Sequence, residues 1–141
     1  MGVVLRAVVT EDPLSVEEHA ALVGSDRAGA VVTFSGVVRD HDGGRSVLEL
    51  EYHSHPSAAD VVAEVVESLS DKYPGVHGIA VSHRVGPLKI GDVALACAVA
   101  AEHRKEAFLL CADLVDEVKA RLPVWKRQVF SDGRDEWVNC P

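Results

Sequence analysis

The sequence lacks any hydrophobic segment long enough to cross a membrane. Its longest uninterrupted apolar run, Val93–Ala101, has nine residues, whereas a membrane-spanning helix needs ~20. The first residues contain no apolar segment preceded by basic ones, so we expect no secretory signal. Arg6 also departs from the myristoylation pattern that Met-Gly would begin. We therefore expect a protein without membrane attachment.

Cysteine is scarce, and its spacing fits no metal site or disulfide framework. Cys97, Cys111 and Cys140 are odd in number, and no two of them form a CxxC motif. Cys97 lies within the apolar run and Cys111 within a helical pattern, where cysteine usually acts as a small buried hydrophobe. We expect a reducing, cytoplasmic environment.

Positive charge is also in deficit. Lys and Arg together number 14 against 22 for Asp and Glu, so the formal net charge is −8. This balance argues against a protein that coats nucleic acid or an anionic membrane. Any anion that the protein binds must therefore be held by a local cluster of cations.

Common motifs for metals and nucleotides are missing as well. His41, His53 and His55 lack the HxxxH and HExxH spacings that place two ligands on one helical face. The acidic loop 40–44 lacks the GxxxxGK[ST] pattern of a phosphate-binding loop. We therefore expect no metal site and no phosphate-binding loop of that type.

What is present suits one folded unit. The 141 residues, 48% of them hydrophobic and 26% charged, have the size and composition of a single globular domain over 1–141. Capping residues such as Ser15 and helical apolar spacing predict three helices, at 15–23, 57–73 and 102–122. Alternating and β-branched patterns predict strands at 3–9, 30–38, 46–53, 78–85, 92–101, 124–130 and 136–140. This order predicts an α+β fold, a mixed-sheet domain with three helices.

The strand expected at 46–53 has two chemically different faces. Leu48, Leu50 and Tyr52 alternate with more polar neighbours, a pattern typical of a half-buried strand. We expect these three side chains to share the buried face.

The third predicted helix carries a lysine in an apolar stripe. Phe108, Ala112, Val115 and Leu122 fall on one helical face, with Cys111 and Val118 beside them. Lys119 falls within this stripe, between Val115 and Leu122. Its stem could lie along the edge of the core while its ammonium reaches water. Alternatively, the ammonium could be partly desolvated, so that a lowered pKa makes the amine a base or nucleophile. Helix position alone favours the first interpretation.

The same helix begins with His103, Arg104 and Lys105, an unfavourable place for cations because the helix dipole is positive there. An anion bound by free backbone N–H groups and these side chains would explain the cluster. A solvated basic turn, offset by Glu102 and Glu106, explains it equally well.

A second group of cations follows that helix. Pro123 turns the chain, so we expect Lys126 on the next strand to lie beside Lys119. Arg39, at the end of a strand, is a further candidate for the same wall. Together they predict a pocket for an anionic small molecule.

Five parts of the sequence match one known family in their order and spacing. They are 29–41 (GAVVTFSGVVRDH), 82–88 (SHRVGPL) with 91–92 (GD), 102–104 (EHR), 118–127 (VKARLPVWKR) and 136–138 (EWV). Through them the chain resembles the large, catalytic subunit of molybdopterin synthase. The Lys-to-Pro-x-Trp-Lys segment is the most specific.

The resemblance implies a fold, partners and a reaction. The fold is of the α/β-hammerhead type, and two large subunits form a homodimer with a small ubiquitin-like sulfur-carrier subunit at each end. The family converts cyclic pyranopterin monophosphate into the dithiolene molybdopterin. Sulfur comes from a thiocarboxylate on the carrier's C-terminal Gly-Gly tail, so the resemblance implies no metal or redox cofactor.

The resemblance also assigns residues. Lys119 matches the family's essential lysine and Lys126 its second pocket lysine, while Arg39, His103 and Arg104 match the residues that hold the anionic end of the substrate. The neighbouring pocket positions are Val37, Val38, Arg127 and Gln128.

Two other functions remain open at this point. A non-catalytic paralogue could bind a pterin or another anion and dock the carrier without turnover. A metal-dependent hydrolase that uses the histidines is the other alternative.

Overall fold

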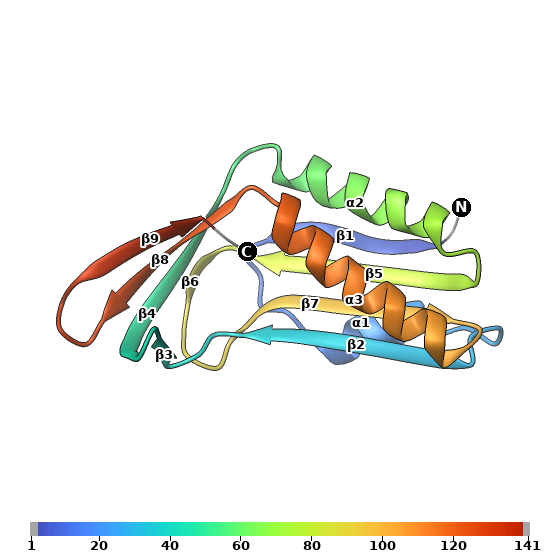
Figure 1. Ribbon diagram of the computed structural model, residues 1–141, viewed down its shortest axis with the longest axis horizontal. Helices are drawn as coiled ribbons and strands as arrows, with labels where there is room; N and C mark the ends of the chain where they lie inside the picture. Colours follow the sequence, from blue (N-terminus) through green and yellow to red (C-terminus); the bar gives the residue numbers. More distant parts are fainter. Residues whose placement is uncertain (1–2, 140–141) are drawn as a thin grey trace.

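Two β-sheets make up the protein, and all three helices pack against only one of them (Figure 1). The computed structural model describes residues 3–139. The helices are α1 Val16–Val23, α2 Ala58–Lys72 and α3 Arg104–Arg121. The strands are β1 Val4–Thr10, β2 Ala30–Val37, β3 His41–Asp42, β4 Arg45–Ser54, β5 Val76–Arg84, β6 Gly86–Leu88, β7 Val93–Ala101, β8 Val124–Phe130 and β9 Asp135–Asn139. The α+β class with three helices is confirmed.

The helix-covered sheet has the strand order β1-β5-β7-β2. β1 runs parallel to β5, and the other two pairs are antiparallel. Figure 1 shows α2 and α3 in front of this sheet and α1 behind it. Because β5 and β7 are covered on both faces, the apolar run of β7 is buried almost throughout.

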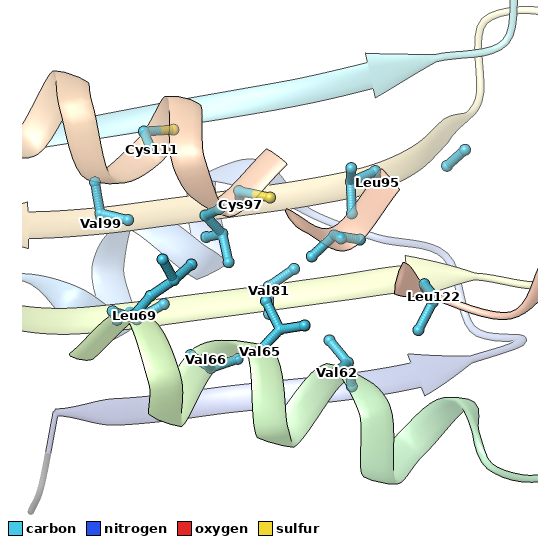
Figure 2. Packing of buried hydrophobic residues seen from close by; sticks show 14 of the residues in the cluster. Val62, Val65, Val66, Leu69, Val81, Leu95, Cys97, Val99, Cys111 and Leu122 are labelled. Atoms are coloured by element: carbon cyan, nitrogen blue, oxygen red, sulfur yellow. The ribbon is translucent and has the colours of Figure 1, made fainter. Parts of the chain in front are cut away.

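The main core lies between this sheet and the two front helices. In Figure 2, Val62, Val65 and Val66 of α2 lie over Val81 of β5, with Cys97 of β7 close by. On the other face, a Cβ on Gly78 would lie 2.8 Å from the Val23 carbonyl oxygen, so α1 can approach the sheet only because that residue is glycine.

The second sheet has the order β3-β4-β8-β9, and β6 also pairs with β4. No strand is predicted between 85 and 92, but Gly86–Leu88 is a short strand paired with β4. Gly86 has a φ of 91°, a conformation that glycine adopts without strain. This strand continues the chain from the first sheet directly into the second.

Two local predictions about the ends of elements are borne out. Ser15 caps α1, since its Oγ accepts a hydrogen bond from the Glu18 N–H at 3.1 Å. β8 spans 124–130 as predicted. The strand expected at 136–140 is β9, but Cys140 lies outside the described residues.

The predicted buried face of 46–53 is wrong at its start. Val47 is buried, whereas Leu48 is 57% exposed. The pairing with β8 shifts register between Val47 and Glu49, and an extra residue in one strand reverses the alternation of its side chains. Leu50 and Tyr52, beyond the irregularity, are buried as expected.

The predicted apolar face of α3 is partly wrong: Cys111, Val118 and Leu122 are buried, but the centre of the buried face lies elsewhere. The buried residues are Ala107, Leu110, Cys111, Leu114 and Val118, whereas Phe108 is 61% exposed. The buried stripe is thus displaced around the helix by about one residue, or about 100°. Of the predicted stripe, Phe108 and Ala112 are exposed and Val115 is half-buried, whereas Leu122 is buried as predicted.

The helices of the described region include none with the length and hydrophobicity needed to span a bilayer. Cys97 and Cys111 are both buried free thiols, and burial raises the pKa of each.

Candidate functional site

A cavity of about 210 Å³ lies where the two sheets meet. Its lining residues are Gly36, Val37, Arg39, Tyr52, His83, Ala94, Leu95, Lys119 and Lys126. Three of these side chains are cations and none is a carboxylate. The wall therefore favours an anionic ligand although the chain as a whole is acidic.

The two lysines reach the cavity from consecutive elements. Lys119 lies in the last turn of α3, and β8 begins just after Pro123. Lys126 is paired with Tyr52 across the antiparallel β4–β8 ladder, so both side chains project from the same face of the sheet. The structure thus places Lys119 and Lys126 on one wall, as the turn at Pro123 predicts.

Arg39 and Val37 line the same cavity, at the end of β2. Arg39 Nη2 lies 3.7 Å from Asp42 Oδ1. The pKa of Asp42 is below its usual value, chiefly because Gln128 Nε2 donates a hydrogen bond of 2.8 Å to its Oδ2, and also because Lys126 and Arg39 are positive. Asp42 therefore stays ionised beside the cavity without lining it.

The other residues predicted to neighbour the pocket, Val38, Arg127 and Gln128, do not line this cavity. Val38 is buried, and its backbone N–H and carbonyl bond to Asp92 and Gly91. Gln128 is buried and holds Asp42. Arg127 lies on the opposite face of β8 from Lys126, pairs with Asp135 at 2.9 Å and lines a separate cavity.

His103 and Arg104 lie at the other end of α3. His103 is the N-cap residue, and both side chains are exposed. Fifteen residues separate Arg104 from Lys119, which corresponds to about 22 Å along the helix axis. Within one chain, His103 and Arg104 are therefore far from the cavity that Lys119 and Lys126 line, called the lysine cavity below.

Two cavity residues with titratable side chains, Tyr52 and His83, were not predicted as part of the site. Tyr52 contributes through its pairing with Lys126, which only the sheet register shows. His83 is a buried imidazole on β5 whose Nδ1–H donates to the Arg84 carbonyl at 2.8 Å. Its place in the segment 82–88, which carries the family resemblance, is the signal that could have identified this titratable ring.

The pKa of His83 is lowered to about 4, chiefly by burial and also by the positive charge of Lys119, while the hydrogen bond to the Arg84 carbonyl opposes this shift. His83 is thus neutral at physiological pH. Its ring meets Tyr52 edge-on, with centroids 4.9 Å apart and an interplanar angle of 82°.

Two other features bear on possible sites. Within residues 3–139, no cluster of three His, Cys, Asp or Glu side chains could hold a metal ion. A larger cavity of about 490 Å³ lies between β1 and α1 and includes His19 and Ser82. It shares no residue with the lysine cavity.

Comparison with known proteins gives concordant results. The model of the family described as MoaE protein matches residues 9–121. The molybdopterin synthase catalytic subunit of Nostoc sp. (strain PCC 7120 / SAG 25.82 / UTEX 2576) is 36% identical over 132 residues, covering 93% of this chain and 80% of that protein.

Solved structures share the fold. Molybdopterin synthase from Staphylococcus aureus superimposes with a TM-score of 0.84 at 32% identity, covering 92% of this chain and 93% of that chain. A complex of subunits 1 and 2 of molybdopterin-converting factor from Helicobacter pylori 26695 contains a similar chain, with a TM-score of 0.70 at 19% identity and coverage of 94% and 89%. The fold expected from the resemblance is confirmed.

Proposed function

Because the chain belongs to the MoaE protein family, we propose that it is the catalytic subunit of a molybdopterin synthase. It transfers two sulfurs to cyclic pyranopterin monophosphate, one from the C-terminal thiocarboxylate of each of two small carrier molecules, and each carrier leaves with a C-terminal carboxylate. The product is the dithiolene of molybdopterin, used for the molybdenum cofactor. The reaction takes place in the cytoplasm and needs no resident cofactor, since the sulfur arrives activated on the carrier.

The observation that carries this proposal is the carboxylate-free wall of cations. Arg39, Lys119 and Lys126 line one small cavity, which suits an anionic pterin and an acyl thiolate donor. Sulfur transfer from an acyl donor requires a group that handles protons and the departing carboxylate. Lys119 fits that role because it lies on the cavity wall at the end of a rigid helix.

A route for the carrier's tail leads toward the same lysine. An apolar groove of about 300 Å³ runs between β2 and α3, and its lining includes Phe34, Phe108 and Val115. Val115 is one helical turn before Lys119. We assign this groove to the carrier, with its Gly-Gly tail entering the cavity, because glycine can pass a constriction that admits no side chain.

The distance along α3 supports a homodimer with a shared site. If His103 and Arg104 hold the substrate's phosphate, the about 22 Å of helix between Arg104 and Lys119 excludes their acting on the same molecule within one chain. A second copy related by a two-fold axis would bring its α3 start to the first copy's cavity. Each of the two cavities then takes one carrier, which gives a heterotetramer.

Reconstitution tests this function. The purified chain is mixed with thiocarboxylated carrier and cyclic pyranopterin monophosphate, and dithiolene formation is followed by mass spectrometry. We expect product with the intact carrier and none with a carrier that lacks its terminal glycines. A folded, dimeric chain that binds carrier and pterin but forms no product would instead support the non-catalytic binding alternative.

A further inference from the structure

The lysine cavity contains a buried imidazole, that of His83, which stays uncharged at physiological pH. The other ionisable groups that line this cavity are Lys119 of α3, Tyr52 of β4, Lys126 of β8 and Arg39 after β2. From β7 only Ala94 and Leu95 line the cavity. Three cations therefore line the same cavity as an imidazole that is 1% exposed, and protonation of His83 would add a fourth positive charge to that wall.

The geometry fixes the tautomer and orientation of this ring. Nδ1 lies 2.8 Å from the Arg84 carbonyl oxygen, so Nδ1 carries the proton and Nε2 the lone pair. β5 holds the backbone between β1 and β7, opposite Val9 and Leu95. The ring is thus held by a hydrogen bond on one side and by two strands along its backbone.

His83 in turn holds Tyr52. The edge-on contact, with centroids 4.9 Å apart, is the favoured geometry for two aromatic rings. Tyr52 lies directly across the ladder from Lys126 and shares the cavity wall with Lys119. A displacement of His83 would therefore move the Tyr52 ring, and the movement of Tyr52 would change the positions of Lys119 and Lys126.

We propose that His83 is a positioning residue for sulfur transfer: its neutral ring fixes Tyr52 and thereby the place of the Lys119 ammonium on the cavity wall. The effect of His83 on the rate of sulfur transfer rests on the proposed function. The electrostatic interaction between His83 and Lys119 does not depend on that function. A neutral ring also gives the wall a rigid support without a carboxylate, which would cancel the charge that attracts the substrate.

Single-turnover sulfur transfer tests the kinetic part. His83→Leu is expected to lower the rate constant at saturating pterin by roughly 10- to 100-fold, the scale for a displaced reacting group, while pterin affinity stays nearly unchanged. His83→Phe keeps a neutral ring against Tyr52 and recovers most of that loss. Equal rates for His83→Leu and the unmodified chain, or equal losses for both variants, would overturn the proposal.

His19 provides a matched control. It is also 1% exposed, and both its ring nitrogens are bonded, to the Ser15 carbonyl and to Ser82 Oγ. It lines only the other cavity. His19→Leu is expected to lower the melting temperature and keep the single-turnover rate constant; a comparable loss of rate would mean that His83→Leu acts through general destabilisation.

NMR tests the coupling without any sulfur transfer. The His83 imidazole is titrated in the dimeric chain, in Lys119→Ala and in Lys89→Ala. Removal of the Lys119 charge is expected to raise the His83 pKa, whereas Lys89→Ala leaves it unchanged. An unchanged pKa in Lys119→Ala would overturn the placement of the ammonium beside this ring. If the unmodified chain forms no product but shows this shift, the proposed function fails and the placement stands.

Discussion

The two ends of α3 both carry cations but provide different environments. At its end, Lys119 joins Lys126 and Arg39 around a partly enclosed cavity that includes a buried neutral imidazole, although the Lys119 and Arg39 side chains are themselves exposed. At its start, His103 and Arg104 are exposed to solvent, and the first N–H groups of the helix have no acceptor within it. An enclosed site strengthens electrostatic interactions, whereas an exposed one chiefly captures charge.

This difference suggests a division of labour. The enclosed end suits groups that act on the reacting atoms, and the exposed end suits groups that bind a phosphate. Since α3 holds the two ends about 22 Å apart, they can cooperate only between chains. Substitutions near Lys119 should therefore lower the rate constant of sulfur transfer, whereas substitutions near Arg104 should lower the affinity for the pterin.

Lys119→Ala is expected to have the largest effect. Loss of a positioned proton-transfer group lowers the single-turnover rate constant by at least ~100-fold. The fold should persist, because the Lys119 side chain is exposed. Lys89→Ala, at an exposed lysine outside the cavity, is the control for rate and for the circular dichroism melt. A folded Lys119→Ala protein with normal turnover would remove this residue from the mechanism.

Arg104→Ala is expected to change affinity instead of rate. A charge-assisted hydrogen bond contributes about 1.5–3 kcal/mol, so the pterin Kd should rise roughly 10- to 150-fold. The rate constant at saturating pterin should stay close to that of the unmodified chain. Arg134→Ala, in the turn before β9, is the control in isothermal titration calorimetry. Unchanged affinity in Arg104→Ala would place the phosphate elsewhere.

The enclosed end should also respond to acid. The unfolded chain takes up a proton on His83 near pH 6.5, whereas the folded chain does so only near pH 4. Stability therefore falls as pH falls through this window, by up to roughly 3 kcal/mol from this group. His83→Phe removes that contribution, so urea unfolding at pH 7 and pH 4.5 should show a smaller loss than in the unmodified chain. Equal losses would show that His83 is protonated in the folded state.

The middle of α3 gives the smallest expected effect. Phe108→Ser should change the free energy of unfolding by no more than ~0.5 kcal/mol, because Phe108 is mostly exposed. Leu110→Ala, at a buried position, should cost about 2–5 kcal/mol. If Phe108 lies in the carrier groove, Phe108→Ser should instead weaken carrier binding. A large loss of stability in Phe108→Ser would mean that α3 is rotated relative to this account.

Local chemistry predicted much of this arrangement. The Ser15 cap and the turn at Pro123 depend on residues close in sequence, and both predictions agree with the structure. The predictions of which side chains of β4 and α3 are buried were wrong at Leu48 and Phe108, because burial there depends on residues distant in sequence. A register shift against β8 exposes Leu48, and packing of α3 on β2 and β7 selects Ala107 over Phe108 for burial.

The candidate site shows the same limit. Its lysines were predicted from one short segment, whereas Tyr52 joins them only through the pairing of β4 with β8. Arg127 and Gln128 are adjacent to Lys126, but alternation and a bond to Asp42 direct them elsewhere. The family resemblance gave the sequence positions of the candidate site residues. Only the fold shows which of these residues line the same cavity.

Subunit complementation tests the shared site most directly. Lys119→Ala and Arg104→Ala chains are unfolded together, refolded as a mixture and assayed at pterin concentrations below the Kd. If each site combines the Lys119 of one chain with the Arg104 of the other, every mixed dimer contains one intact site, and random mixing restores about a quarter of the normal activity. If both residues act within one chain, no mixed dimer has an intact site, and the mixture would show only the average of the two variants.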